Sequence, residues 1–465
     1  MSGSILRRSG IALISTAVLV ALPVLPFRPA GLGVQGAAAV TASAASGPEG
    51  AVSAGQRAGQ GQGHSAGRGA PGDRPGSGLG GRWRGGWAAS PQAPAGGNGQ
   101  NWSETGFVRQ TVRQVVRVST GGSRARIELS NRYGSTPLKV AGASIARTAR
   151  GASVRPGSVR ALTFGHGRSA TIPAGGELRS DGVGLTVGAL ESLTVTLYLD
   201  APTGPATFHA LAMATSYRAA GDHRSDTGAA AFAETSRSWY YLSGVEVSGG
   251  RAAHRGAVVT FGDSITDGYG STLDANRRYP DALAERFAAT GRSRSVLNAG
   301  ISGNQLTNDT SASGEKGVAR FRKDVLDEPH VGTVIVLEGI NDIGASERSI
   351  TSDSLTPDVS VRQLIAGQRE LIRQAHSRGV RVIGATLTPF KGASYYTERG
   401  EAKRDALNDW IRTSGEFDGV LDLDHALSDP ADRHRIAAPY DVGDHLHPSD
   451  AGYRAMAAAV DLDAL

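Results

Sequence analysis

The chain has 465 residues and no cysteine. That length accommodates two or three domains of ~100–200 residues each, and the lack of cysteine excludes disulfides, thiolate metal sites, cysteine nucleophiles and cysteine-ligated iron–sulfur clusters. The net charge of +6 is concentrated in residues 1–82, which contain seven arginines and two acidic residues. The remaining 383 residues carry 42 basic and 41 acidic side chains. We expect no nucleic-acid partner, because the folded part lacks the necessary basic excess.

Residues 1–44 have the pattern of an export signal. Arg7 and Arg8 provide a positive start, Ile11–Phe27 is mostly apolar, and small residues follow. The alternative is a membrane anchor, but a span needs ~20 apolar residues, whereas this run has 17 and contains two prolines. We therefore predict a cleaved signal peptide, a secreted protein and no membrane contact after cleavage. The two arginines leave a twin-arginine export route open.

Residues 45–83 form a low-complexity segment rich in Gly, Ala and Ser. Thirteen glycines fall between Gly47 and Arg82, far above the ~7% of ordinary proteins. Such a segment buries too little apolar surface to offset its ordering entropy, so we expect a flexible linker. It contains a G-x-S-x-G motif at 63–67 and a G-x-G-x-x-G motif at 76–81. We interpret both as chance matches, because neither has the flanking strand and helix that these motifs need.

Residues 84–247 show the period-two pattern of β-strands. In Glu191–Leu199, aliphatic residues alternate with Ser, Thr and Tyr. The segments Val115–Ser119 and Arg124–Ser130 flank a Thr-Gly-Gly-Ser turn, which predicts a hairpin. Several short strands without a convincing helix predict an antiparallel β-sandwich domain over this region.

Aromatic residues are concentrated in or just before this predicted β-domain. They include four of the five tryptophans of the chain and two adjacent tyrosines: Trp83, Trp87, Trp102, Trp239, Tyr240 and Tyr241. Exposed rings of this kind stack on sugars, whereas buried rings fill the core of a sandwich. We favour the core.

Residues 255–465 follow a glycine-bearing connector (Ser248–Gly256) and alternate short apolar runs with helical patterns. The predicted strands are Val258–Phe261, Ser295–Asn298, Val331–Leu337, Val380–Ala385 and Val420–Leu423. The predicted helices are Pro280–Ala289, Glu315–Leu326, Val361–Arg378, Glu398–Thr413 and Ala451–Val460. This succession predicts an α/β domain with a parallel sheet covered by helices on both faces. Sites in such sheets form beyond the carboxyl ends of the strands.

Polar residues follow the first three of these strands. Ser264 stands in Gly-Asp-Ser-Ile-Thr-Asp-Gly, where the flanking glycines allow a tight turn that presents the hydroxyl at the sheet edge; the alternative is a helix cap. After the second strand, the N–H of Gly303 can approach a ligand oxygen closely. After the third, Asn341 offers a side-chain amide. An ordinary turn is the alternative for Gly303, and an Asx turn for Asn341.

A carboxylate and two histidines precede the last predicted helix, in Asp-His-Leu-His-Pro-Ser. Asp444 lies three residues before His447, a spacing that lets the carboxylate accept a hydrogen bond from Nδ1 and leaves Nε2 free to take a proton from a serine. His445 competes with His447 for this role. A metal site for the two histidines lacks a third ligand.

In this order, the four segments resemble the blocks of the SGNH (GDSL) hydrolase family. Ser264 matches the serine of block I, Gly303 the glycine of block II and Asn341 the asparagine of the G-x-N-D block. Asp444 and His447 match the final D-x-x-H block. The resemblance covers roughly residues 255–460 and implies a flavodoxin-like three-layer parallel sheet.

The resemblance also implies a serine esterase that works through an acyl-enzyme. His447, rather than His445, deprotonates Ser264, while Asp444 orients the imidazole. The backbone N–H groups of Ser264 and Gly303 and the amide of Asn341 form the oxyanion hole. No cofactor and no metal are implied.

The expected substrate is a small-molecule or polysaccharide-linked ester. The loops after the strands are polar and show no amphipathic lid, which favours short acyl, acetylated-carbohydrate or aryl esters over long-chain triglycerides. The order of the domains resembles the secreted arylesterase-like and acylhydrolase branch of the family. The alternatives are a long-chain lipase, an acyltransferase, and a polysaccharide-binding protein with an inert hydrolase half. The sequence gives no prediction of the oligomeric state.

Overall fold

The structure is a computed structural model that describes residues 82–96, 100–250, 255–292, 294–351 and 357–465. The predicted signal peptide, both chance motifs and all of the predicted linker except Arg82 and Trp83 lie outside these ranges. All elements described below belong to one compact unit, Pro75–Leu465.

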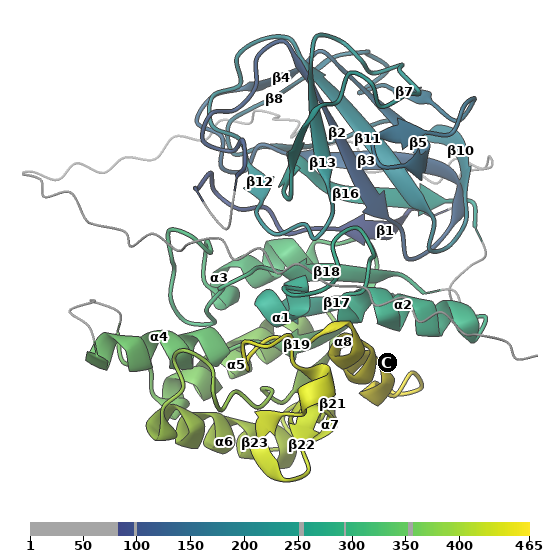
Figure 1. Ribbon diagram of the computed structural model, residues 1–465. Coiled ribbons are helices and arrows are strands. Elements are labelled where there is room, and N and C mark those ends of the chain that lie inside the picture. The colour runs from purple at the N-terminus through teal and green to yellow at the C-terminus, as the bar shows by residue number, and fades with distance from the viewer. Residues whose placement is uncertain (1–81, 97–99, 251–254, 293, 352–356) are drawn as a thin grey trace, which may run out of the picture. The chain divides into compact units, whose positions relative to one another are not determined.

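Two antiparallel sheets occupy residues 84–248 (Figure 1). The first has the strand order β1-β16-β3-β10, and β9 also pairs with β3. Its strands are β1 (Arg84–Ala88), β3 (Gly122–Ser130), β9 (Glu177–Arg179), β10 (Val183–Val187) and β16 (Leu242–Ser248). The second has the order β14-β13-β2-β11-β5-β6, and β7 also pairs with β5. Its strands are β2 (Gln110–Arg117), β5 (Gly142–Arg150), β6 (Ser153–Val154), β7 (Arg160–Leu162), β11 (Ser192–Leu199), β13 (Ser216–Ala220) and β14 (Glu234–Ser236).

Both sheets contribute to a single hydrophobic cluster. Ile127 of β3 and Val245 of β16 are buried in it together with Val116 of β2 and Val195 of β11. Two short antiparallel pairs complete this region: β4 (Leu138–Val140) with β8 (Ala170–Ile172), and β12 (Phe208–His209) with β15 (Trp239–Tyr240).

The aromatic residues of this region fill its core, as predicted. Trp87, Trp102 and Trp239 are all buried, and so are Tyr240 and Tyr241. Trp87 and Trp239 meet edge to face at 4.7 Å between ring centroids. These rings are therefore not exposed for stacking on sugars, and that alternative is wrong for these five residues.

The predicted hairpin is wrong, because β2 and β3 lie in different sheets. Strand β2 pairs with β11 and β13, whereas β3 pairs with β9, β10 and β16. At Gly121 the connection passes so close to another segment that a Cβ atom would lie 2.4 Å from the carbonyl oxygen of Val187. Long-range partners thus override the local turn pattern.

Residues 257–421 supply a parallel sheet of order β18-β17-β19-β20-β21. The strands are β17 (Ala257–Gly262), β18 (Val296–Gly300), β19 (Val331–Leu337), β20 (Arg381–Ala385) and β21 (Gly419–Leu421). All residues of β17 are buried, as expected for a strand in a sheet that is covered on both faces. In chain order the arrangement is 2-1-3-4-5, the flavodoxin-like order, which confirms the predicted parallel sheet.

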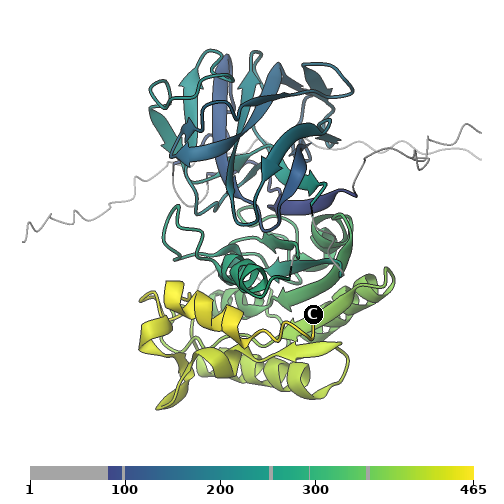
Figure 2. The ribbon, with the colours of Figure 1, turned by 90° about the vertical axis from the view of Figure 1, so that its right-hand side faces the viewer.

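Helices lie on both faces of this sheet (Figures 1 and 2). They are α1 (Ser264–Asp267), α2 (Tyr279–Ala289), α3 (Gly317–Phe321), α4 (Ile340–Thr351), α5 (Val361–His376), α6 (Glu398–Thr413), α7 (Leu423–Leu427) and α8 (Asp450–Ala459). A π-helical turn, η1 (Arg322–Leu326), extends α3, and a 3₁₀ turn, η2 (Ala438–Tyr440), precedes α8. A short antiparallel pair, β22 (Ser428–Asp429) and β23 (Asp432–Ile436), follows α7.

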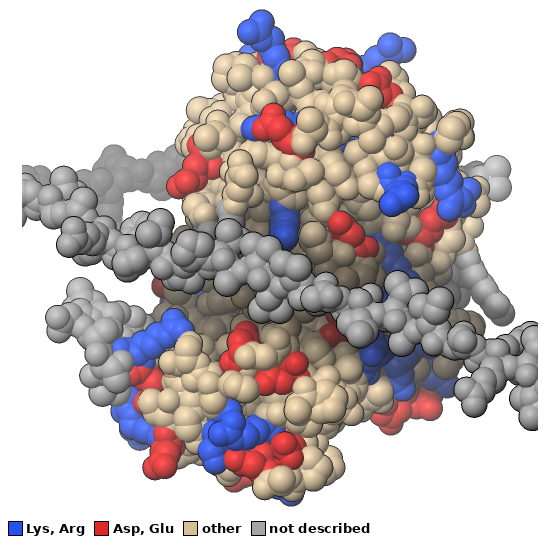
Figure 3. Space-filling view, viewed as in Figure 1, with Lys and Arg blue, Asp and Glu red and all other residues tan. Residues whose placement is uncertain are grey.

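The five predicted helices are present, with differences at their ends. The predicted segment Glu315–Leu326 begins at Gly317 and changes to π-helix at Arg322. The polar stretch expected as a loop after β19 contains helix α4, which the sequence prediction missed. Within the described ranges, none of the helices combines the length and the apolar character needed to cross a bilayer. On the face shown in Figure 3, Lys and Arg side chains are interspersed with Asp and Glu.

Candidate active site

The predicted catalytic serine and histidine lie in contact at the carboxyl edge of the parallel sheet. Strand β17 ends at Gly262, and Ser264 is the first residue of α1. Its Oγ lies 2.7 Å from Nε2 of His447, which comes from the loop before α8. Both residues are buried, with 5% and 9% of their surfaces exposed. Residues 183 positions apart are thus brought within hydrogen-bond distance.

Asp444 holds the imidazole from the opposite side. Its Oδ2 lies 2.6 Å from Nδ1 of His447, and its Oδ1 accepts hydrogen bonds from the backbone N–H groups of Leu446 and His447. Burial opposes ionisation, but these hydrogen bonds lower the pKa of Asp444 to about 2. An ionised carboxylate only accepts hydrogen bonds, so Nδ1 is the donor and Nε2 is left as the acceptor for the Ser264 hydroxyl.

His445 is directed elsewhere. Its Nδ1 lies 2.6 Å from Oδ2 of Asp441, and nearly half of its side chain is exposed. The structure therefore gives His447 the contact with Ser264, which is the choice that the family resemblance implies.

The first two predicted donors of the oxyanion hole are backbone N–H groups. Among the residues that the structure describes, neither the N–H of Ser264 nor that of Gly303 has a hydrogen-bond acceptor. Gly303 has a φ of +77°, and a Cβ atom there would lie 2.4 Å from Oγ of Ser313. A side chain would be strained at this position, and glycine leaves the N–H accessible.

The third predicted donor, Asn341, lines a cavity that also contains the serine. A cavity of about 370 Å³ is lined by Ser264, Gly303, Asn341 and His447. One N–H of the Asn341 amide donates to the backbone oxygen of Asn304 at 3.1 Å. This bond fixes the orientation of the amide and leaves its second N–H for a ligand. The five residues predicted from the sequence thus meet around one cavity.

The α/β part of the chain matches a known family. Residues 260–455 match the model of the GDSL-like Lipase/Acylhydrolase family. This domain belongs to that family. No curated protein sequence matches the chain.

Several solved structures resemble the GDSL domain. A lipolytic protein of the G-D-S-L family from Desulfitobacterium hafniense DCB-2 is 21% identical, with 44% of this chain and 97% of that chain covered and a TM-score of 0.34. An aryl esterase from M. smegmatis is 17% identical (44% and 95% covered, TM-score 0.35). An acetyl xylan esterase from Geobacillus stearothermophilus is 20% identical (44% and 93% covered, TM-score 0.35). With TM-scores below 0.5, these similarities do not bear on fold or substrate.

A buried arginine of the GDSL domain ties the donor-bearing segments together. Arg320, on α3, is 1% exposed. Its guanidinium donates to the backbone oxygen of Gly262 at 2.8 Å, to that of Ala299 at 2.7 Å and to Oδ1 of Asn304 at 2.8 Å. These acceptors flank Ser264 and Gly303, and the backbone oxygen of Asn304 is the acceptor for Asn341.

Acidic groups surround this guanidinium. Asp324 Oδ2 lies 3.2 Å from Nη1 of Arg320, and Glu338 Oε2 lies 3.6 Å from Nη2. Asp324 also accepts a 2.8 Å hydrogen bond from Arg132 of the antiparallel region. Burial raises the pKa of Glu338 well above its ordinary value and that of Asp263 to about 7.

Two further carboxylates hold the loop that carries Gly303. Asp267 accepts a hydrogen bond from the N–H of Ser302 at 2.9 Å and faces the buried His209 of β12 at 3.0 Å. Asp342 accepts from the backbone N–H groups of Leu306 and Thr307. The sequence analysis missed Arg320, Asp267 and His209. Arg320 had no signal in the sequence, because its neighbours on the same helix face include Lys316, Lys323 and Asp324.

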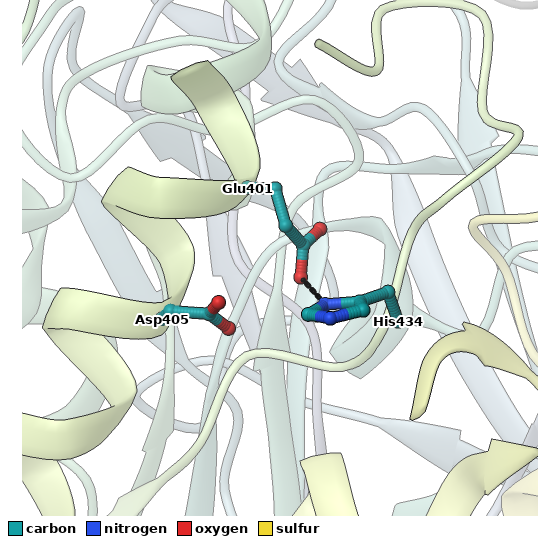
Figure 4. A group of neighbouring side chains, drawn as sticks. All are labelled: Glu401, Asp405 and His434. Carbon is teal, nitrogen blue, oxygen red and sulfur yellow. Dashed lines mark hydrogen bonds and ion pairs between the residues drawn. The ribbon is translucent and has the colours of Figure 1, made fainter. Parts of the chain in front are cut away.

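A second group of polar side chains lies away from the serine. Glu401 and Asp405 on α6 and His434 on β23 place ligand atoms within 4.8 Å of one another (Figure 4). His434 Nδ1 lies 2.6 Å from Glu401 Oε1, and the guanidinium of Arg404 contacts both carboxylates at 3.0 Å. Because the guanidinium of Arg404 lies against both carboxylates, we interpret the group as an ion-pair network.

Proposed function

We propose that the protein is a serine esterase that hydrolyses carboxylic esters through an acyl-enzyme on Ser264. The observation that carries this proposal is the 2.7 Å contact between Ser264 Oγ and His447 Nε2, with Asp444 on the other ring nitrogen. A nucleophile, a base and a carboxylate that orients the base are the requirements for acyl transfer. The free N–H groups of Ser264 and Gly303 add donors for the charge that develops.

In the first step, His447 Nε2 takes the proton from Ser264 as Oγ forms a bond to the ester carbonyl carbon. The carbonyl oxygen becomes negatively charged and is stabilised by the N–H groups of Ser264 and Gly303 and the amide of Asn341. Asp444 is ionised at neutral pH and stabilises the imidazolium.

In the second step, the bond between the carbonyl carbon and the alcohol oxygen breaks, and the alcohol leaves with the proton from His447. A water molecule then gives a proton to His447 and attacks the acyl-enzyme. The acid is released when the Ser264 oxygen takes that proton back.

Short acyl groups fit the cavity best. Its volume is about 370 Å³, and its lining includes the small side chains of Ser302, Ala312, Ser313 and Ser394. We expect turnover of p-nitrophenyl esters to be highest for acetate and to fall towards twelve-carbon chains. Activity that rises with chain length to twelve carbons would support a long-chain lipase instead.

Two histidines of the same loop, His445 and His447, provide a matched test of the esterase proposal. His447→Ala should reduce kcat for p-nitrophenyl acetate about 10⁴-fold or more, since removal of a triad member has effects of this order. His445→Ala, two residues away, should leave it within about twofold. Comparable activity in both variants would contradict the assignment of the base.

We also propose the organisation of the whole chain. The two antiparallel sheets with a shared core support a β-sandwich domain over residues 84–247, followed by the catalytic domain over 255–465. The pattern of residues 1–44 supports secretion with cleavage of this segment. N-terminal sequencing of protein from the culture medium tests this proposal; full-length protein retained in cells would contradict it.

A further inference from the structure

A second cavity adjoins the one that contains Ser264. Its volume is about 860 Å³, within the range of about 300–1,000 Å³ that holds small-molecule ligands. We call it the outer groove. One wall comes from the antiparallel region and includes Gln100, Thr215 and Thr235–Ser238. The other comes from the GDSL domain, from residues 269, 270, 273 and 442–444.

The outer groove meets the catalytic cavity on the histidine side. Ala210, Tyr269 and Asp444 line both cavities, whereas Gly303 and Asn341 line only the catalytic one. Tyr269 stands at the junction, with its ring centroid 4.3 Å from that of His447 and 38% of its surface exposed. A ligand that extends from the serine past His447 therefore enters the outer groove.

The chemistry of ester cleavage decides which part of the substrate lies there. The carbonyl oxygen must point to Gly303 and Asn341, and the alcohol oxygen must lie within reach of His447, which protonates it. The alcohol part of the ester therefore projects to the histidine side. We infer that the outer groove binds the alcohol part of the substrate, so that the antiparallel region selects the alcohol. This inference rests on the proposed esterase function.

The lining of the groove indicates a polyhydroxylated alcohol such as a sugar. The wall from the antiparallel region carries hydroxyl and amide side chains, the guanidinium of Arg237 and the apolar Leu211 and Met213. Tyr269, Leu273 and Val442 offer apolar surface opposite. Sugars present both an apolar ring face and hydroxyl groups. Among the described residues, the exposed side chains of Gln100 and Arg237 have no hydrogen-bond partner and are free to bind hydroxyls.

The test compares two acetyl esters that differ only in their alcohol: acetylated xylose and p-nitrophenyl acetate. The quantity measured is the ratio of kcat/KM for the sugar ester to that for the aryl ester. Arg237→Ala removes a charged donor from the groove, and Thr235→Leu replaces a hydroxyl at an exposed position of β14 with a bulkier apolar side chain. Arg237→Ala should lower the ratio about tenfold, because the loss of a hydrogen bond to a charged group has an effect of this order. Thr235→Leu should lower it severalfold, because it removes a neutral hydrogen-bonding group.

Arg168→Ala is the matched control, since Arg168 is an exposed arginine of the antiparallel region that does not line the groove. It should leave the ratio unchanged. An unchanged ratio in both groove variants would overturn the inference, and so would a wild-type protein that cleaves the aryl ester but no acetylated sugar. If wild-type protein cleaves neither ester, or if Ser264→Ala retains full activity, the proposed function itself is wrong. Thermal unfolding checks that each variant is folded.

Discussion

The guanidinium of Arg320 donates a hydrogen bond to the backbone oxygen of Gly262 at 2.8 Å, two residues before the proposed nucleophile. The same group donates to Ala299, four residues before Gly303. One buried side chain thus fixes the two backbone segments that carry the N–H groups of the proposed oxyanion hole. Arg320 touches no reacting atom, so we regard it as a positioning residue.

Arg320→Lys should lower kcat for p-nitrophenyl acetate about 10²-fold with little change in KM. A lysine ammonium cannot reproduce the planar fork that reaches several acceptors, and small displacements of catalytic groups have effects of this size. Arg322→Lys, two residues later and exposed, is the control. If Arg320→Lys lowers the melting temperature but leaves kcat unchanged, the arginine serves stability alone.

Asn341→Ala should reduce kcat about 10²–10³-fold, which is the usual effect of removing one oxyanion donor. KM should change little, because the bond strengthens as charge develops on the carbonyl oxygen. Asn308→Ala is the matched control, since Asn308 is a half-buried asparagine that does not line the catalytic cavity. Steady-state kinetics on both variants would contradict this role if their kcat values were alike.

Asp263→Asn should stabilise the protein at high pH. Burial raises the pKa of Asp263 to about 7, compared with ~3.9 for a free aspartate. Between these values the folded state keeps a proton that the unfolded state has lost, so the free energy of unfolding falls as the pH rises. Asparagine carries no charge and retains an Oδ1 that can accept from the N–H of Ile265.

The melting temperature of Asp263→Asn should therefore exceed that of the wild type by several degrees at pH 8. The difference should shrink towards pH 4. Asp409→Asn, at an exposed position of α6, should show no such trend. A difference that grows on acidification would mean that the burial of Asp263 has been misjudged.

Removal of divalent ions should leave esterase activity unchanged. The proposed mechanism uses protein groups only, and the guanidinium of Arg404 already contacts both Glu401 and Asp405. Turnover of p-nitrophenyl acetate before and after dialysis against EDTA measures this. Loss of activity that a divalent ion restores would show that a metal takes part.

The local pattern of the sequence predicted the parallel sheet well. Its strands are mostly apolar, and the residues that follow them, such as Ser264 and Asn341, lie at the carboxyl ends of the strands. The pattern failed where partners are distant in the chain. Strand β3 follows β2 directly, yet it pairs with β16, more than a hundred residues later. The contact between Arg132 and Asp324 spans 192 positions and has no local signature.

Helix α4 shows a different limit of the sequence analysis. It begins at Ile340, inside the Gly-Ile-Asn-Asp motif, in a polar stretch after the third strand that we expected to be a loop. The polar residues of this stretch concealed the start of a helix. Asp342, within the same motif, holds the backbone of Leu306 and Thr307, a role that only the folded structure reveals.

The central claim is that Ser264 is the nucleophile, and covalent labelling tests it most directly. A fluorophosphonate ester forms a stable adduct only with a serine whose hydroxyl is activated by a neighbouring base. Mass spectrometry of the digested protein should locate one adduct on Ser264, with none in Ser264→Ala and an unchanged yield in Ser302→Ala, whose side chain lines the same cavity. An adduct on another serine, or esterase activity that survives in Ser264→Ala, would contradict the account.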